Sequence, residues 1–232
     1  TEVIPVGGGS WHPVRREMLA VKRAGNVAQV HMLKTPLGEV KQLTDFPDPV
    51  GGGNWEPNSG KYFVFFKATG GTEIAQLHRY DVDSGTITRL TTNDKMRIGG
   101  GPWTTAGDRY LYTSVPTGGG TSSETIKTEF YTIDPANPDS AKLLVALDGV
   151  GWGAVEFSPD DKKLVVGKYV SANESYIYLY DIATGDKTLL TPQEGSEKVA
   201  WNVGGFSKDG KGLYLTTDKG SEFARLVYMD LA

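Results

Sequence analysis

The sequence contains no cysteine, so disulfide bonds and thiolate chemistry are excluded, although a protein without cysteine suits either redox compartment. No apolar run approaches the roughly 20 residues that a membrane-spanning helix needs. A basic excess is also lacking, because 24 Lys and Arg residues are outnumbered by 28 Asp and Glu residues. Nucleic-acid-binding domains usually carry a basic field, so we expect neither nucleic acid nor a membrane as a partner.

Glycine is abundant, with 30 residues, and many of them form short runs directly before an aromatic residue. Each of these aromatic residues opens a polar turn, and this pattern recurs five times. The five turns begin at Trp11, Trp55, Trp103, Phe157 and Phe206, at spacings of 44, 48, 54 and 49 residues. Repeats of about 40–50 residues are typical of β-propeller blades, which have four strands each.

Two other features support this period. The pairs Leu43-Thr44, Leu90-Thr91 and Leu190-Thr191 close three of the repeats. Residues 155–191 contain four strand-like segments separated by polar turns, and residues 176–180 alternate Tyr with aliphatic side chains. The sequence therefore predicts an all-β fold, a five-bladed propeller of four-stranded antiparallel sheets.

We expect one domain over residues 1–232. Its repeats span about 6–49, 50–97, 98–149, 150–200, and 201–232 together with 1–5. The fifth repeat has only three strands of its own, and an uncovered apolar edge promotes aggregation. Residues 1–4 are predicted to pair in the last blade, which closes a monomeric ring. The alternative is that edges from two chains pair to form an oligomer.

The glycine runs have two interpretations. Glycine permits close approach of backbones where blades converge on a central channel. A phosphate-binding loop would instead require a helix after the glycines, and a Trp and a turn follow them here. The sequence favours crowding around the channel.

The sequence also lacks a hydrolase signature. A hydrolase nucleophile elbow, Gly-x-Ser-x-Gly, does not occur, and the nearest matches at residues 120–124 and 205–209 lack the final glycine. We therefore expect no catalytic residue, no cofactor site and no enzymatic activity in this chain.

The three histidines provide no clear metal site. His12 lies in the first turn, whereas His31 and His78 each end an Ala-Gln-apolar-His segment of a predicted strand. Tyr131 and Tyr178 occupy the same position in the next two repeats. A metal site would need further ligands converging on these residues, so we interpret them as a repeated strand position and predict no metal.

The remaining motifs favour structural roles. Residues 81–85 resemble a calcium loop faintly and are predicted to form a hairpin turn. Residues 173–175 match a glycosylation sequon, and Arg15, Arg16, Lys22 and Arg23 are expected on a solvated edge. The three Trp residues that open turns are predicted to lie in the core.

Residues 157–164 and 206–213 resemble the F-S-P-D-G-K-x-L repeats of two propeller groups, the N-terminal propeller of the prolyl oligopeptidase family and the TolB-type propeller. The first resemblance implies a substrate-gating or scaffolding domain, since the catalytic residues of those peptidases lie in a separate hydrolase domain. The second implies a protein-interaction scaffold, so a protein or peptide is the expected partner. A propeller hydrolase or lyase acting at the channel mouth, and a reduced or engineered propeller without activity, remain as alternatives.

Overall fold

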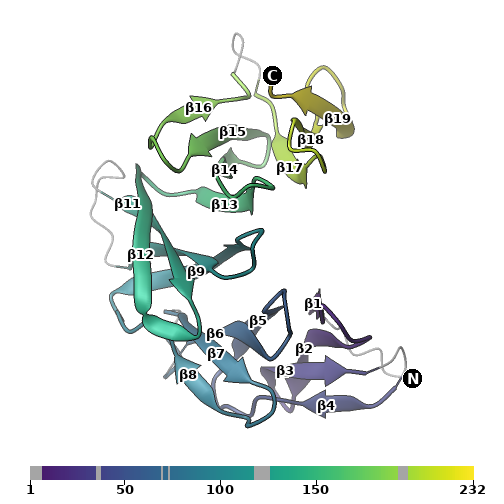
Figure 1. The fold of residues 1–232 in the computed structure, drawn as a ribbon, viewed down its shortest axis with the longest axis vertical. Coiled ribbons are helices and arrows are strands. Elements are labelled where there is room, and N and C mark those ends of the chain that lie inside the picture. Colours follow the sequence, from purple (N-terminus) through teal and green to yellow (C-terminus); the bar gives the residue numbers. More distant parts are fainter. Residues whose placement is uncertain (1–6, 35–37, 69, 73, 118–125, 193–197) are drawn as a thin grey trace. The chain divides into compact units, whose positions relative to one another are not determined.

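A computed structural model describes residues 7–34, 38–68, 70–72, 74–117, 126–192 and 198–232. Every regular element of these residues is a β-strand, and the strands form five antiparallel sheets in which each strand pairs with its neighbour in the sequence (Figure 1). The all-β prediction is therefore confirmed. No helix of the described residues has the length and apolar character needed to cross a membrane.

The strands have the following bounds. Sheet 1 comprises β1 (Gly7–Trp11), β2 (Met18–Ala24), β3 (Val27–Leu33) and β4 (Val40–Gln42). Sheet 2 comprises β5 (Val50–Trp55), β6 (Tyr62–Lys67), β7 (Gln76–Asp81) and β8 (Ile87–Arg89). Sheet 3 comprises β9 (Met96–Trp103), β10 (Tyr110–Pro116), β11 (Lys127–Asp134) and β12 (Asn137–Asp148). Sheet 4 comprises β13 (Trp152–Phe157), β14 (Lys163–Ser171), β15 (Glu174–Asp181) and β16 (Lys187–Leu189). Sheet 5 comprises β17 (Trp201–Phe206), β18 (Gly212–Thr217) and β19 (Arg225–Asp230).

The chain divides into two compact units, which are described separately. The first unit contains residues 1–99 and 134–140, and the second contains residues 100–133 and 141–232. Sheets 1 and 2 therefore belong to the first unit, and sheets 4 and 5 to the second. The single-domain organisation stays a prediction.

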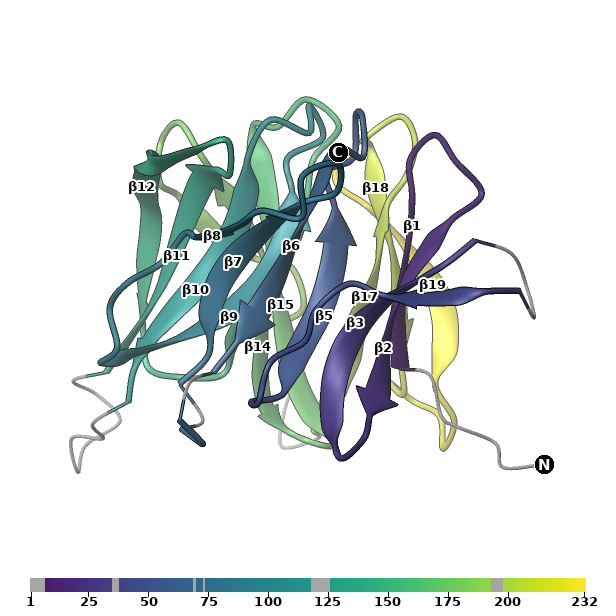
Figure 2. The same cartoon turned by 90° about the horizontal axis from the view of Figure 1, so that it is seen from below.

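The core of the first unit lies between sheets 1 and 2. Leu19 and Met32 of sheet 1 pack on Trp55, Phe63 and further aromatic residues of sheet 2. The rings of Phe63 and Tyr80 stack with centroids 4.9 Å apart. Figure 2 shows the central strands of sheet 2, β6 and β7, side by side.

The second unit has two such layers, one on each face of sheet 4. Leu164 and Val166 of β14 face sheet 3, whereas Val165 between them packs with Leu213 and Leu215 of sheet 5. Successive side chains of a strand point to opposite faces, so a continuous apolar run fits a sheet that is covered on both sides.

A side chain directly after each aromatic residue caps the turn that follows. Nδ1 of His12 accepts from the N–H groups of Val14 and Arg15, and the Glu56 carboxylate accepts from three backbone N–H groups. Hydroxyl oxygens accept a backbone N–H at the same position in the other three sheets; they belong to Thr104, Ser158 and Ser207. The side chain at this position thus accepts from backbone N–H groups in every repeat, two to four residues further along the chain for His12 and Glu56 and five residues further for the three hydroxyls.

The first strand of each sheet whose register is known contains a β-bulge. The bulges lie between Gly7 and Gly9, Gly51 and Gly53, Ala154 and Glu156, and Val203 and Gly205. Gly52 has a φ of 63°, an angle that favours glycine at a bulge. The glycine runs therefore permit β-bulges as well as the close approach of neighbouring backbones.

Crowding explains only some of these glycines. A Cβ on Gly101 would come within 2.6 Å of Leu111, and one on Gly53 within 3.1 Å of Leu19. A Cβ on Gly51 or Gly153 would meet no atom within 4 Å. The crowding prediction is wrong for these two positions, because their sheet faces are open there.

Two further predictions need correction. Trp11 is 66% exposed, whereas the equivalent Trp55 is 3% exposed. The reason is that each of these residues lies on the face directed at the preceding sheet, and sheet 2 covers the opposite face of sheet 1. The sequence also predicts the last strand of the third repeat over residues 142–146, whereas β12 is longer and spans Asn137–Asp148. The three strands of sheet 5 are as predicted, and residues 1–4 lie outside the described residues.

Candidate functional site

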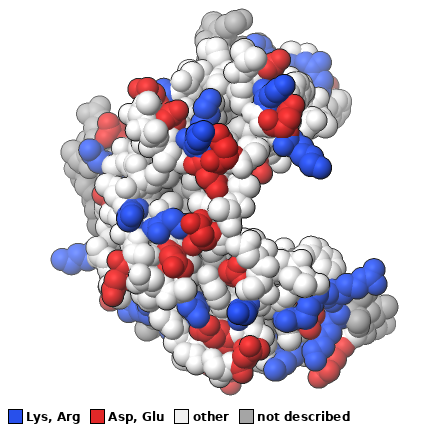
Figure 3. Space-filling view, in the orientation of Figure 1, with Lys and Arg blue, Asp and Glu red and all other residues white. Residues whose placement is uncertain are grey.

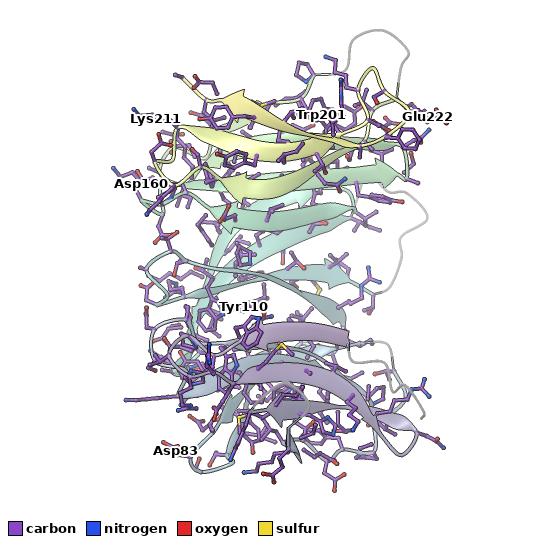
Figure 4. The ribbon with its side chains drawn as sticks, turned by 90° about the vertical axis from the view of Figure 1, so that its right-hand side faces the viewer. Asp83, Tyr110, Asp160, Trp201, Lys211 and Glu222 are labelled. Atoms are coloured by element: carbon purple, nitrogen blue, oxygen red, sulfur yellow. The ribbon has the colours of Figure 1, made fainter. Side chains whose placement is uncertain are left out.

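A cleft of about 420 Å³ opens between sheets 4 and 5 of the second unit. Its lining comes from β13, β14, β15 and β17, including Gly153, Gly167, Ile177 and Trp201. Figure 4 labels Trp201 on β17, the strand that forms one wall. We call this site the β13–β17 cleft.

The floor of the cleft is a cross-strand pair of glycines. Gly153 of β13 lies opposite Gly167 of β14, and Gly167 lies opposite Ile177 of β15. A Cβ on Gly153 would have no atom within 4 Å, and one on Gly167 would have its nearest at 4.0 Å. The space exists because neither glycine fills it, and Ile177 provides an apolar surface beside it.

The wall at Trp201 is fixed by hydrogen bonds. The Trp201 N–H donates to the Ser175 hydroxyl at 2.7 Å, and that hydroxyl donates to the Trp201 carbonyl at 2.7 Å. The Ser175 N–H also donates to the carbonyl of Val199 at 3.1 Å. Ser175 thus holds the beginning of β17 beside β15, so the cleft has a defined width.

Strand β13 has a free edge, since it is the end strand of sheet 4. The N–H of Tyr169 donates to the carbonyl of Gly151 at 2.8 Å, so the backbone of Gly151 points toward β14. Backbone direction alternates along an antiparallel strand, which directs the N–H and C=O of Trp152 away from β14. Such an edge can pair with another extended chain.

A cluster of aromatic and basic side chains lies on the other face of sheet 4. The ammonium groups of Lys168 and Lys187 lie 4.6 Å and 4.5 Å from the centre of the Trp152 ring. Tyr178 packs against Trp152 with centroids 5.1 Å apart. Burial, and then the positive charge of Lys187, lower the pKa of Lys168. Lys168 also donates to the carbonyl of Val150, at the beginning of the same edge.

The histidines occupy the predicted strand positions. Nδ1 of His31 lies 3.0 Å from the carbonyl oxygen of Gln29, and Nδ1 of His78 lies 3.0 Å from that of Gln76. Both rings are buried, and each Nδ1–H donates to the carbonyl two residues earlier. Tyr131 and Tyr178 lie on β11 and β15, the third strands of their sheets, as predicted.

The described residues contain no group of three or more His, Cys, Asp or Glu side chains that could hold a metal ion. Residues 81–85 form the β7–β8 hairpin turn, closed by the Gly85 N–H donating to Asp81. Arg15 pairs with Glu17 at 2.8 Å on an exposed edge, and Asn173 lies in the β14–β15 turn.

A second groove lies at the other end of sheets 4 and 5, with a volume of about 360 Å³. It borders the turns that contain Asp160 and Lys211, which Figure 4 labels. Its rim is charged, whereas the β13–β17 cleft is lined by glycine backbone and aromatic side chains. On the face drawn in Figure 3, basic and acidic side chains lie interspersed.

The cleft and the Trp152 cluster were not predicted from the sequence. Trp152 lies outside the repeated Gly-Gly-Gly pattern, in Val-Gly-Trp-Gly, and this departure was the available signal. The partners of Trp152 come from three different strands, so only the register of sheet 4 brings them together.

Comparison with known protein families and with curated proteins gives no match. Solved structures share the fold. TolB from Acinetobacter baumannii is 20% identical with a TM-score of 0.61 over 92% of this chain, and a prolyl endopeptidase is 19% identical with a TM-score of 0.71 over 97%. An oligogalacturonate lyase in complex with manganese is 13% identical with a TM-score of 0.75 over 97%. The predicted resemblance to TolB-type and prolyl oligopeptidase propellers is thus confirmed for the fold. The chain spans 51%, 34% and 65% of these three proteins.

Proposed function

We propose that this chain is a non-catalytic β-propeller domain that binds an extended peptide in the β13–β17 cleft. The peptide adds as a strand to the free edge of β13, and one of its side chains enters the space above Gly153 and Gly167. In a peptidase of the prolyl oligopeptidase type, such binding would hold or admit a substrate. In a TolB-like scaffold, the bound peptide would belong to a partner protein.

The glycine floor is the observation that carries this proposal. Strand addition supplies hydrogen bonds from the backbone and specificity from pockets that take alternate side chains. The edge of β13 provides the first of these, and the space above Gly153 and Gly167 provides the second. No nucleophile elbow occurs in the sequence, which favours binding over hydrolysis.

The proposal includes a closed ring of five blades. Residues 1–4 would pair beside β19, the end strand of the three-stranded sheet 5, and the protein would be a monomer. Deletion of residues 1–4 should then lower the melting temperature strongly or cause association. A dimer whose mass and stability do not change on this deletion would contradict closure.

If the ring does not close, the outer face of sheet 5 favours protein interaction as an alternative function. Leu226 is 70% exposed there, and the rings of Tyr214 and Tyr228 lie 5.4 Å apart on the same face. At the matching positions of sheet 4, Val165 and Ile177 are buried under sheet 5. An exposed apolar face of this kind is typical of a site that meets another protein.

Peptide binding can be measured by fluorescence anisotropy with a labelled octapeptide that alternates apolar and polar residues. The double variant Gly153→Ala, Gly167→Ala fills the floor and should weaken binding at least about ten-fold, equivalent to about 1.4 kcal/mol. Gly51→Ala is the matched control, because it adds a methyl to open space outside the cleft. Equal binding by the double variant and the control would contradict the proposed site. Cleavage of the peptide by the purified chain would contradict the non-catalytic role.

A further inference from the structure

We propose that the Trp152 cluster, comprising Trp152, Lys168, Tyr178 and Lys187, binds a carboxylate carried by the peptide that adds to β13. This inference rests on the proposed function and deepens it. It specifies an extended peptide with an acidic group at one position and an apolar side chain at a neighbouring one.

The register of sheet 4 supports this placement. A strand added beside β13 would direct successive side chains to opposite faces of the sheet. The side chain beside Gly153 would enter the cleft, and the side chain beside Trp152 would lie on the face of the Trp152 cluster. Directly opposed residues of paired strands have Cβ atoms about 5 Å apart, so this side chain would reach the indole ring.

The basic side chains of this face have no acidic partner in the described part of the chain. The ion pairs found there involve other Lys and Arg residues, and neither Lys168 nor Lys187 lies within 4.0 Å of a carboxylate oxygen. Lys168 uses one of its three donors on the carbonyl of Val150. The Lys187 ammonium lies 5.0 Å from the ring of Tyr178 as well as 4.5 Å from that of Trp152.

Two like charges that share one aromatic ring repel each other, and an anion between them removes this repulsion. Burial, and then the positive charge of Lys187, already lower the pKa of Lys168. A carboxylate accepts hydrogen bonds from several donors at once and suits this arrangement. The rival interpretation is that the two lysine stems merely cover the apolar surface of Trp152. In that case a carboxylate on the peptide would have no effect.

The experiment compares two labelled octapeptides that differ only by Glu or Gln at the position beside Trp152. Both carry a C-terminal amide, and a third peptide has Gln with a free C-terminal carboxylate. Dissociation constants are measured at 50 and 300 mM NaCl. The Glu peptide should bind about five-fold more tightly than the Gln peptide at low salt, and the difference should shrink at high salt, because partly exposed ion pairs are modest and screened. If the third peptide binds most tightly, the carboxylate that the Trp152 cluster binds is a peptide C-terminus.

Lysine variants locate the site. Lys168→Met with Lys187→Met should abolish the preference for carboxylate while retaining the affinity for the Gln peptide. Lys211→Met, at the opposite end of the two sheets, is the matched control and should retain the preference. Equal binding of all three peptides, or a preference that survives in the double variant, would overturn this inference and leave the proposed function intact. No binding of any peptide would contradict the proposed function, and this inference with it.

Discussion

The carboxylate of Glu56 accepts a hydrogen bond from the backbone N–H of Gly60 at 3.0 Å, across the turn that joins β5 to β6. The same carboxylate accepts from the N–H groups of Asn58 and Ser59 at 2.7 Å and 2.8 Å. Burial alone would raise the pKa of Glu56, but a hydrogen bond from the Ser59 hydroxyl and these three backbone hydrogen bonds together hold it below its ordinary value. The turn therefore depends on an ionised side chain.

Glu56→Ala should lower the free energy of unfolding by about 2 to 3 kcal/mol, because it leaves several backbone donors without a charged acceptor. Chemical denaturation measures this change. Glu222→Ala is the control, since Glu222 is exposed, and it should have little effect. Similar losses for the two variants would show that the cap contributes nothing specific.

Acidification should destabilise the first unit below about pH 6.5. Burial lowers the pKa of both His12 and His78 from the ordinary value of 6.5. The unfolded chain then binds more protons than the folded chain in this range, so stability rises with pH and is lost as pH falls below 6.5. Melting temperatures between pH 7.5 and 5.5 test this.

The histidine contribution can be separated by substitution. His78 packs against Phe65 with centroids 5.4 Å apart, so His78→Phe is a substitution of similar shape. It should reduce the pH dependence of the melting temperature. A melting temperature that is constant from pH 7.5 to 5.5 in the original protein would contradict the prediction.

Alanine substitutions should distinguish the open position Gly153, on β13, from the crowded position Gly151, just before this strand. Gly151 has a φ of 85°, and a Cβ there would overlap the carbonyl oxygen of Tyr169, so Gly151→Ala should cost more than about 2 kcal/mol. Gly153→Ala should change the free energy of unfolding by no more than about 1 kcal/mol. Equal costs at the two positions would mean that the floor of the cleft is not open.

Three threonines should each stabilise the fold through the same backbone contact, and Thr44 should contribute most, because its hydroxyl also donates to Gln29 Oε1 at 2.7 Å. The Oγ1 atoms of Thr44, Thr91 and Thr191 each accept the N–H of the residue 14 positions earlier, at 2.9 Å. Each Thr→Val variant leaves a buried strand N–H without this partner and should cost about 1 to 3 kcal/mol. Thr188→Val, on the exposed strand β16, is the control and should have little effect. A Thr→Val variant at any of the three positions that costs no more than the control would contradict the equivalence of the repeats.

The sequence predicted the repeats because their signals are local. Trp55 and Phe157 each end a strand and open a turn, and both are buried as expected. Trp11 carries the same signal and is exposed, because burial depends on which sheet covers its face. No local pattern contains that information.

The site could not be predicted for a related reason. Gly153 and Gly167 are 14 residues apart, and a β-bulge between Ala154 and Glu156 lies beside their pairing. Lys187 lies on yet another strand, and no residue near it in the sequence indicates that it contacts Trp152. Register and bulges arise from the whole sheet, so the floor and the Trp152 cluster become visible only in three dimensions.

Hydrogen exchange at the backbone amide of Trp152 tests the central claim most directly. Strand addition to β13 should slow exchange at this amide at least about ten-fold when the octapeptide is bound, because a free edge donor gains a partner. The neighbouring amide of Gly153 already points toward β14 and should change little. Saturating peptide that leaves the Trp152 amide unprotected would contradict strand addition at this edge.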